Sequence, residues 1–387
     1  MKKQILLGAL TLALLFPLSG CADLLERSYT SSAVHVDRPP TAEDPSVLRV
    51  ENYRELVSAV LYLVSQGAEE GTIQLHDYTG SVENDLPAAC LEVATQDPLG
   101  AYCVDYIKHE YTRVVSYYQA NLDIHYRRSQ EQVRSMVRVT GTGAIRTELQ
   151  EALSRFAPEV VLRVAYFSED ENSIDQLIRQ AYYDTPAAAL GFPQTEISLY
   201  PETGRERVVE ILLTYPESAE ELRRESELLA EQVEALPTPV QGGEQEKMVR
   251  QSLSQLWSYA AYAPDGGTSA YDALVSGVAN EEGMALAYTL LSRRMGLVCR
   301  VVEGEKAGEP WFWNELSLSE GEKRYLDPSA GTGALHSAQE LLDAGYRWPE
   351  GPQESRLGEE NGVEGQNMEQ TQENIQKISL QGARIVI

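Results

Sequence analysis

The chain has 387 residues, of which 43% are hydrophobic and 24% charged, and its formal net charge at pH 7 is −27. This acidic balance argues against nucleic acid as a partner and against electrostatic adhesion to anionic lipid, since both need clustered lysine and arginine. The length provides material for at least two hydrophobic cores. We therefore expect an acidic protein of several domains.

The beginning of the chain has the order of an export signal. Lys2 and Lys3 give a basic start, residues 5–18 form an apolar run too short to span a bilayer comfortably, and Leu-Ser-Gly-Cys ends the segment at Cys21. This order resembles the bacterial lipoprotein signal, which is cut before the cysteine. The resemblance implies a signal peptide over residues 1–20 and a lipid-modified Cys21. An ordinary secretory signal is the alternative.

Lipid on Cys21 would hold the protein on the extracytoplasmic face of the cell membrane. Each buried methylene contributes about 0.8 kcal/mol, so two acyl chains make a stable anchor where one is marginal. Residues 21–46, rich in Ser, Thr, Pro and Asp without sustained periodicity, are expected to be a flexible tether.

Residues 47–139 and 140–240 alternate between helical and strand spacing, which predicts two α+β modules that weakly repeat each other. In the first we expect a helix from Tyr53, a strand at residues 72–76, an apolar helical stretch to about His109 and a long alternating segment at 114–126. In the second we expect helices at 145–153 and 174–183, a strand at 160–166, a hairpin of 196–200 with 208–215, and a charged helix at 217–236.

Two features of these modules leave alternatives open. Cys90 and Cys103 are thirteen residues apart, so they are either a disulfide bridge or two buried thiols. The tyrosine pairs at residues 117–118 and 182–183 suit either a surface that binds glycan or peptide, or half-buried positions on amphipathic strands.

Residues 241–349 contain three blocks in a fixed order: SAYDALVSGVANEEGMALAYTLLSRRMGLVCRVVEGE, PWFWNEL and RYLDPSAG. They resemble the bacterial transglutaminase-like family, which has the papain-like cysteine protease fold. The family's Cys-x-Gly-Tyr-Ala aligns with Glu-Glu-Gly-Met-Ala and places Glu281 at the nucleophile position. Its His-Ala-Trp-Asn places Trp311 at the base position, and its Leu-Asp-Pro-Thr retains Asp327. The resemblance implies an α+β domain with an antiparallel sheet and a degenerate triad.

These replacements predict a domain without thiol catalysis. Acyl transfer from an amide needs a nucleophile activated by a neighbouring base. Glu281 cannot replace a thiolate, and the indole of Trp311 has an N–H donor but no basic lone pair. We expect a binding or scaffolding module at the cell envelope, whose partner is an envelope protein or a peptidoglycan peptide.

The alternative function is an enzyme. A transglutaminase-like amide hydrolase, or a hydrolase using Glu281, Glu282 and Asp327 as paired carboxylates, would act on envelope peptides or glycans. Trp313 and Asn314 are further candidates for the cleft, which we expect to be crowded, negatively charged and selective for a cationic group. At least one carboxyl pKa there should be raised.

No cofactor or metal is expected. The short glycine turns lack the lysine of a phosphate loop, and there is no Cys-x-x-Cys. Residues 350–376 contain seven glutamates and one arginine, which is typical of an acidic disordered tail, and residues 377–387 alternate like a strand.

The Cys21→Ser variant should lose lipid modification and accumulate as precursor or as released protein. Metabolic labelling with a fatty acid measures this directly. A labelled Cys21→Ser protein would show that the anchor lies elsewhere.

Overall fold

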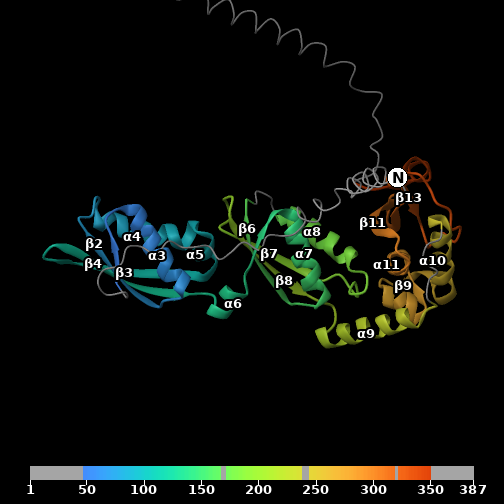
Figure 1. The fold of residues 1–387 in the computed structure, drawn as a ribbon, viewed down its shortest axis with the longest axis horizontal. Helices are drawn as coiled ribbons and strands as arrows, with labels where there is room; N and C mark the ends of the chain where they lie inside the picture. The colour runs from blue at the N-terminus through green and yellow to red at the C-terminus, as the bar shows by residue number, and fades with distance from the viewer. Residues whose placement is uncertain (1–46, 167–170, 238–243, 319–320, 350–387) are drawn as a thin grey trace, which may run out of the picture.

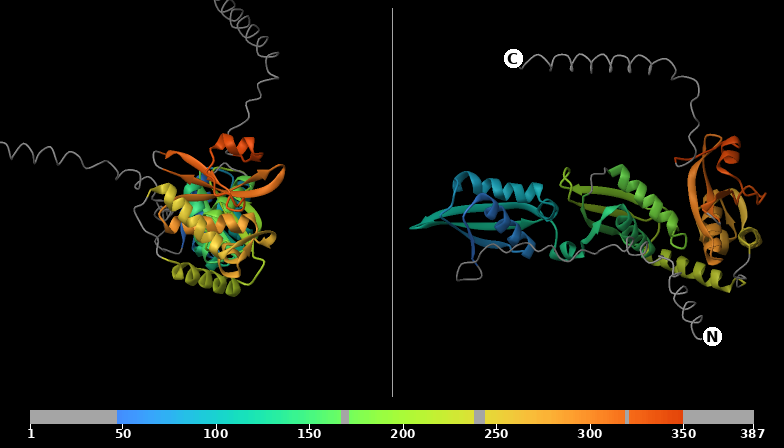
Figure 2. Two further views of the ribbon diagram at one scale, coloured as in Figure 1. Left: turned by 90° about the vertical axis from the view of Figure 1, so that its right-hand side faces the viewer. Right: turned by 45° about the horizontal axis from the view of Figure 1, so that its top comes forward.

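The computed structural model describes residues 47–166, 171–237, 244–318 and 321–349. Within these ranges three bodies follow one another along the long axis of the molecule (Figures 1 and 2). The expected signal peptide, Cys21, tether, acidic tail and C-terminal segment lie outside the described residues. Among those described, no helix has the length and apolar character needed to cross a membrane.

The first body is an α+β module with one mixed sheet in the order β1-β2-β4-β3. Its elements are, in chain order, β1 (Leu48–Val50), α3 (Tyr53–Gln66), β2 (Glu70–His76), α4 (Val82–Gln96), α5 (Pro98–Cys103), β3 (Val104–Val114) and β4 (Tyr117–Tyr126). The expectation of helix as far as His109 was wrong. Helical structure ends at Cys103, because residues 104–114 pair along their length with β4 in a hairpin.

The second body repeats this topology. Its elements are α6 (Gln130–Ser135), β5 (Val137–Thr140), α7 (Gly141–Ser154), β6 (Glu159–Ala165), α8 (Glu171–Asp184), β7 (Gln194–Tyr200) and β8 (Arg207–Thr214). Both sheets pair their first two strands in parallel and the others antiparallel, and the order here is β5-β6-β8-β7. The opening strands β1 and β5 are too short to show a periodicity in the sequence. The second module also begins earlier than expected, because β5 starts before the predicted boundary at residue 140.

The third body is an α+β domain with an antiparallel sheet in the order β13-β12-β11-β14. The charged helix α9 (Ala219–Ala235), expected with the second module, bonds to that module through Ser226 and the Ala187 carbonyl and also contacts η1 (Asp272–Ser276) of the third body. The other elements of the third body are α10 (Gln245–Tyr259), β9 (Ala261–Gly267), β10 (Val278–Ala279), α11 (Glu281–Arg294), β11 (Val298–Lys306), β12 (Glu309–Ser317), β13 (Lys323–Leu326), α12 (Ala338–Asp343) and β14 (Tyr346–Arg347). The expected α+β fold class is confirmed.

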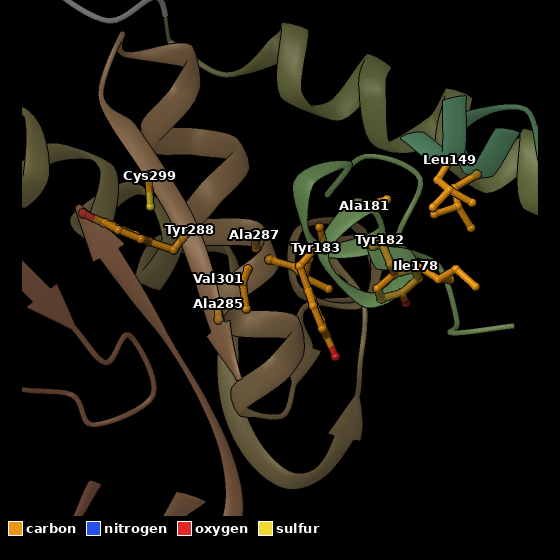
Figure 3. Packing of buried hydrophobic residues seen from close by; sticks show 14 of the residues in the cluster. Leu149, Ile178, Ala181, Tyr182, Tyr183, Ala285, Ala287, Tyr288, Cys299 and Val301 are labelled. Atoms are coloured by element: carbon orange, nitrogen blue, oxygen red, sulfur yellow. The ribbon is translucent and has the colours of Figure 1, made fainter. Parts of the chain in front are cut away.

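One hydrophobic core joins the second module to the third body. At the end of α8, Tyr182 and Tyr183 are buried between their own module and the face of α11 that carries Ala285 and Ala287 (Figure 3). The tyrosine pair at residues 182–183 is therefore part of the core at the end of a helix, and both readings of the sequence are wrong for it.

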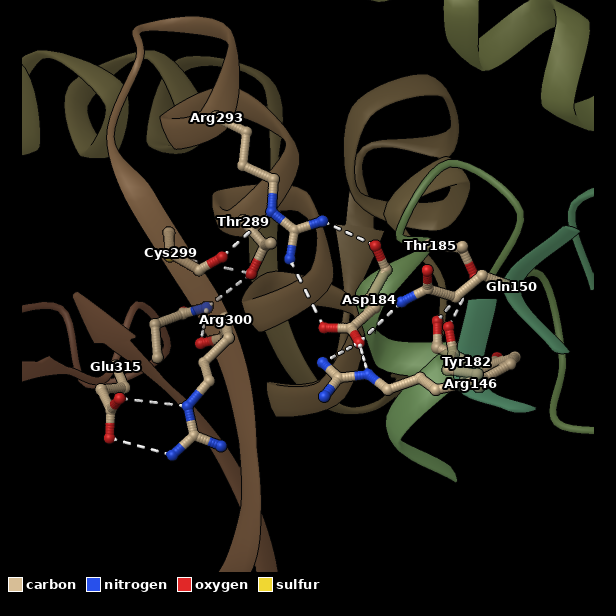
Figure 4. A network of polar contacts seen from close by, with 12 residues as sticks. Arg146, Gln150, Tyr182, Asp184, Thr185, Thr289, Arg293, Cys299, Arg300 and Glu315 are labelled. Carbon is tan, nitrogen blue, oxygen red and sulfur yellow. Dashed lines mark hydrogen bonds and ion pairs between the residues drawn. The ribbon is translucent and has the colours of Figure 1, made fainter. Parts of the chain in front are cut away.

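Asp184, at the end of α8, links the same two bodies by polar contacts (Figure 4). Its carboxylate accepts hydrogen bonds from Arg146 and, at 2.9 Å, from Gln150. Arg293 of α11 donates to the Asp184 carbonyl at 2.6 Å and to the Cys299 carbonyl at 3.0 Å. This arginine thus fixes α11 against both α8 and β11.

Cys90 and Cys103 are both free and buried, so the bridge considered from the sequence is not formed. Burial raises the pKa of each thiol to about 12. Both side chains pack in the core of the first module, and the structure therefore supports the reading of two buried thiols.

An ion pair connects the first and second modules. Arg128 donates to both carboxylate oxygens of Glu210, at 3.0 and 2.7 Å, and its guanidinium lies 5.5 Å from the ring centre of Tyr102. Only 5% of Glu210 is exposed. This bidentate pair is costly to break, because the buried carboxylate would keep its charge with only the Tyr200 hydroxyl, at 3.2 Å, as a donor.

Arg128→Met keeps the aliphatic packing and leaves the buried Glu210 carboxylate without a cation, so the free energy of unfolding should fall by about 3 kcal/mol in urea denaturation. The matched control is Arg250→Met, which removes an exposed pair with Glu246 and should cost less than about 0.5 kcal/mol. Equal losses in the two variants would mean that the pair does not stabilise the junction.

Candidate functional site

The helix that would carry the nucleophile starts as the sequence predicts. Asn280 is the N-cap of α11 and accepts a hydrogen bond from the backbone N–H of Gly283 at 3.1 Å, while Glu281 and Glu282 occupy the first turn. Carboxylates there are favoured by the helix dipole. Gly283 is required because a Cβ would lie 2.8 Å from the carbonyl oxygen of Gly267.

Trp311 is aligned with the expected base and makes one of the hydrogen bonds that such a base would make. Its indole Nε1 donates to Asp327 Oδ2 at 2.9 Å. In a functional triad the carboxylate accepts such a bond from the imidazole and orients it. The indole reproduces the donor but offers no lone pair for proton transfer.

Asp327 is also held by residues that the sequence reading missed. Lys306 Nζ lies 3.3 Å from its Oδ2, the Tyr346 hydroxyl donates to the same oxygen at 2.6 Å, and Ser329 donates to Oδ1. Burial raises the pKa of Asp327, but the hydrogen bonds from Ser329, Tyr346 and Trp311 and the charge of Lys306 outweigh it and hold the pKa below its ordinary value.

Lys306 corrects the expectation of a negatively charged cleft that selects an external cation. Its ammonium lies 4.6 Å from the ring centre of Trp311 and 4.8 Å from that of Tyr346, so cation–π attraction adds to the ion pair with Asp327. The chain itself supplies the cation. No sequence motif indicates this, since Lys306 reaches Asp327 only after β11, β12 and β13 have paired.

Within the described residues, no hydrogen bond or ion pair joins Glu281 to Asp327 or to Trp311, so the pairing of these two carboxylates stays a prediction. Tyr262 is close to all three: its ring centre lies 6.3 Å from that of Trp311, and burial together with the charges of Glu281 and Asp327 raises its pKa.

Glu282 faces the second module and not Asp327. Its Oε1 accepts a hydrogen bond from the Tyr183 hydroxyl at 3.1 Å. Burial, with smaller contributions from the charges of Glu303 and Glu281, raises its pKa to about 7, although Tyr183 and Arg179 oppose the shift. The sequence predicts a carboxyl pKa raised by repulsion between Glu281 and Asp327, but the pKa of Asp327 is lowered and the raised pKa is that of Glu282, chiefly through burial.

Trp313 and Asn314 are structural and do not line a cleft. Trp313 is fully buried and packs edge-on against Tyr346. The Asn314 amide donates to the Ala285 carbonyl at 3.0 Å and to the Thr289 hydroxyl at 2.8 Å. Asn314 therefore fixes α11 to β12, and both residues correct the sequence prediction.

Neither a thiolate nor an imidazole is found at this site. Cys299 is buried, and burial raises its pKa to about 12, so it is a core residue. Within the described ranges no group of three or more His, Cys, Asp or Glu side chains could hold a metal ion.

Glu282→Gln tests the buried carboxyl. In the folded chain this group keeps its proton to about pH 7, against about 4.3 when unfolded. Between these values the folded state binds more protons, so stability falls as pH rises. The amide should therefore raise the melting temperature at pH 8, and raise it by less at pH 5.

The control is Glu305→Gln, an exposed glutamate on β11, which should shift stability by less than about 0.5 kcal/mol at both pH values. If Glu282→Gln behaved like Glu305→Gln, Glu282 would not be the titrating group.

Residues 227–350 match the family model of the transglutaminase-like superfamily, and the match begins inside α9. No curated protein matches the chain closely enough to count as similar.

A solved structure described as a TGase has 16% identity and a TM-score of 0.25, covering 46% of this chain and 53% of that one. The periplasmic domain of TgpA from Pseudomonas aeruginosa, bound to ethylmercury, has 18% identity and a TM-score of 0.19, covering 35% and 64%. The chain spans less than two thirds of either protein. Residues 227–350 are a domain of the transglutaminase-like superfamily.

Proposed function

We propose that this protein is an exported lipoprotein, anchored through Cys21 on the extracytoplasmic face, whose transglutaminase-like domain is a noncatalytic binding or scaffolding module at the cell envelope. The order of the first 21 residues supports the anchor. An envelope protein or a peptidoglycan peptide is the proposed partner.

One observation carries the noncatalytic assignment. The Asp327 carboxylate, the remaining member of the triad, is bound by Trp311, Lys306, Tyr346 and Ser329 at once. A carboxylate held in this way has no remaining role as an orienter of a base or as a general base. Loss of two members of a catalytic triad leaves little turnover beyond what binding alone provides.

The position of the domain favours the scaffolding half of the proposal. Its central helix shares a core with α8 of the second module, and Arg293 bonds to the end of that helix. The Tyr183–Glu282 hydrogen bond lies at the same junction, next to the former nucleophile position. Glu282, one residue after the aligned nucleophile position, therefore contacts the protein's own second module.

The unmodified protein should neither hydrolyse nor crosslink peptide amides. Casein, a glutamine donor with a labelled amine, and glycan substrates test this, with release of product measured over hours. Hydrolysis or crosslinking that is lost in Glu281→Gln would overturn the noncatalytic assignment.

The double variant Glu281→Cys with Trp311→His should restore a thiol next to an imidazole. We expect iodoacetamide to modify it roughly tenfold faster at pH 7 than the single variant Glu281→Cys, because a neighbouring imidazolium lowers the thiol pKa. The background is low, since Cys90, Cys103 and Cys299 are buried. Equal rates in the double and single variants would mean that residues 281 and 311 do not face each other.

A further inference from the structure

The residues around the β3–β4 turn and the loop before α4 form a hollow in the first module. This hairpin end of the sheet lies far from the transglutaminase-like domain (Figure 1). On β4, Ala120 and Leu122 are buried under the helices, but Tyr118, nearer the hairpin turn, is only half-buried. Its neighbours on β3, Tyr111 and Arg113, are exposed. Together with the loop before α4 they enclose a volume of about 380 Å³.

Aromatic rings form the walls of this hollow and are fixed in place. Tyr111 and Tyr118 meet edge to face with their centres 6.1 Å apart. The Tyr78 hydroxyl donates to Asp85 at 3.0 Å, and at Gly80 a Cβ would lie 2.9 Å from the Tyr78 ring. The loop can approach Tyr78 this closely only because residue 80 is glycine.

Three charged side chains line the hollow without a charged partner. Asp77, Glu83 and Arg113 make no ion pair or hydrogen bond through their charged groups within the described residues, apart from the approach of the Arg113 guanidinium to 5.8 Å from the ring centre of Tyr118. The charged groups of these three side chains are therefore available for hydrogen bonds to a ligand in the hollow.

We propose that this hollow binds a saccharide, with about one or two pyranose rings lying against Tyr111 and Tyr118. Tyrosine faces give apolar contact to the C–H face of a sugar ring, and the carboxylates of Asp77 and Glu83 accept hydrogen bonds from its hydroxyls. The volume lies near the lower end of the roughly 300–1,000 Å³ of small-molecule sites.

A peptide ligand fits these observations less well. Sheets recognise extended peptides through the free backbone of an edge strand, with side-chain pockets as a supplement. The surface of the hollow is made mainly by side chains from the sheet face and by the loop at residues 77–83, and it does not run along the free edge of β3. The observations therefore favour a ring-shaped, hydroxyl-rich ligand.

Isothermal titration of the full chain with three probes tests the proposal: cellotetraose, maltotetraose and a β-1,4-linked N-acetylglucosamine tetrasaccharide. At least one should bind, and Tyr111→Ala should weaken that binding about tenfold through loss of the ring contact. Glu83→Gln, a milder change at an exposed position, should weaken it about fivefold.

Tyr106→Ala is the matched control. Tyr106 lies on the same strand, is 44% exposed and stacks on His125 on the opposite face of the sheet. It should leave the affinity unchanged, with circular dichroism showing that all variants are folded. The proposal is overturned if none of the probes binds at millimolar concentration, if Tyr106→Ala weakens binding as much as Tyr111→Ala, or if tetraalanine binds in place of every saccharide.

Discussion

The burial of α11 on nearly all sides is the constraint on which the arrangement of the second and third bodies depends. Residues 283–289 are buried without interruption. A helix with no solvent face must be covered by several partners. Here β12 lies against it through Asn314, α10 shares its core, and the end of α8 reaches it through Tyr183. The second module is therefore part of the packing of the transglutaminase-like domain.

The same constraint accounts for the chemistry at the start of α11. A carboxylate in a protein interior must be compensated. The Asp327 carboxylate accepts hydrogen bonds from Trp311, from Tyr346 and from both the backbone N–H and the hydroxyl of Ser329, and it pairs with the Lys306 cation. Its pKa is therefore lowered. Glu282 receives one hydroxyl while Glu281 and Glu303 stand nearby, and its pKa rises. The two carboxyls thus differ because of their neighbours, and the neighbour that neutralises Asp327 is Lys306.

The two N-terminal modules show how one topology serves different positions. Both have the strand order that places the third and fourth strands at one side of the sheet. In the second module Val161 and Val208 pack towards the first module, and Tyr182 packs towards the third body, so both ends are covered. In the first module the hairpin end of the sheet has no neighbour among the described residues, which leaves Tyr111 and Arg113 exposed.

Periodicity and capping residues by themselves determined most helices and strands, the α+β class and the repeat, while the three triad positions were predicted from the resemblance to the transglutaminase-like family. These signals are local, and the N-cap at Asn280 and the hairpin after residue 194 follow from them. The extent of the helix after Cys90 and the opening strands of both modules depended on strand pairing, which joins residues distant in sequence. Only the tertiary structure showed that Lys306 and Tyr346 hold Asp327, that Glu282 faces Tyr183, and that Asn314 bonds to α11. In each case the partner lies on another element, and its distance is set by how the elements pack and not by the spacing of residues along the chain.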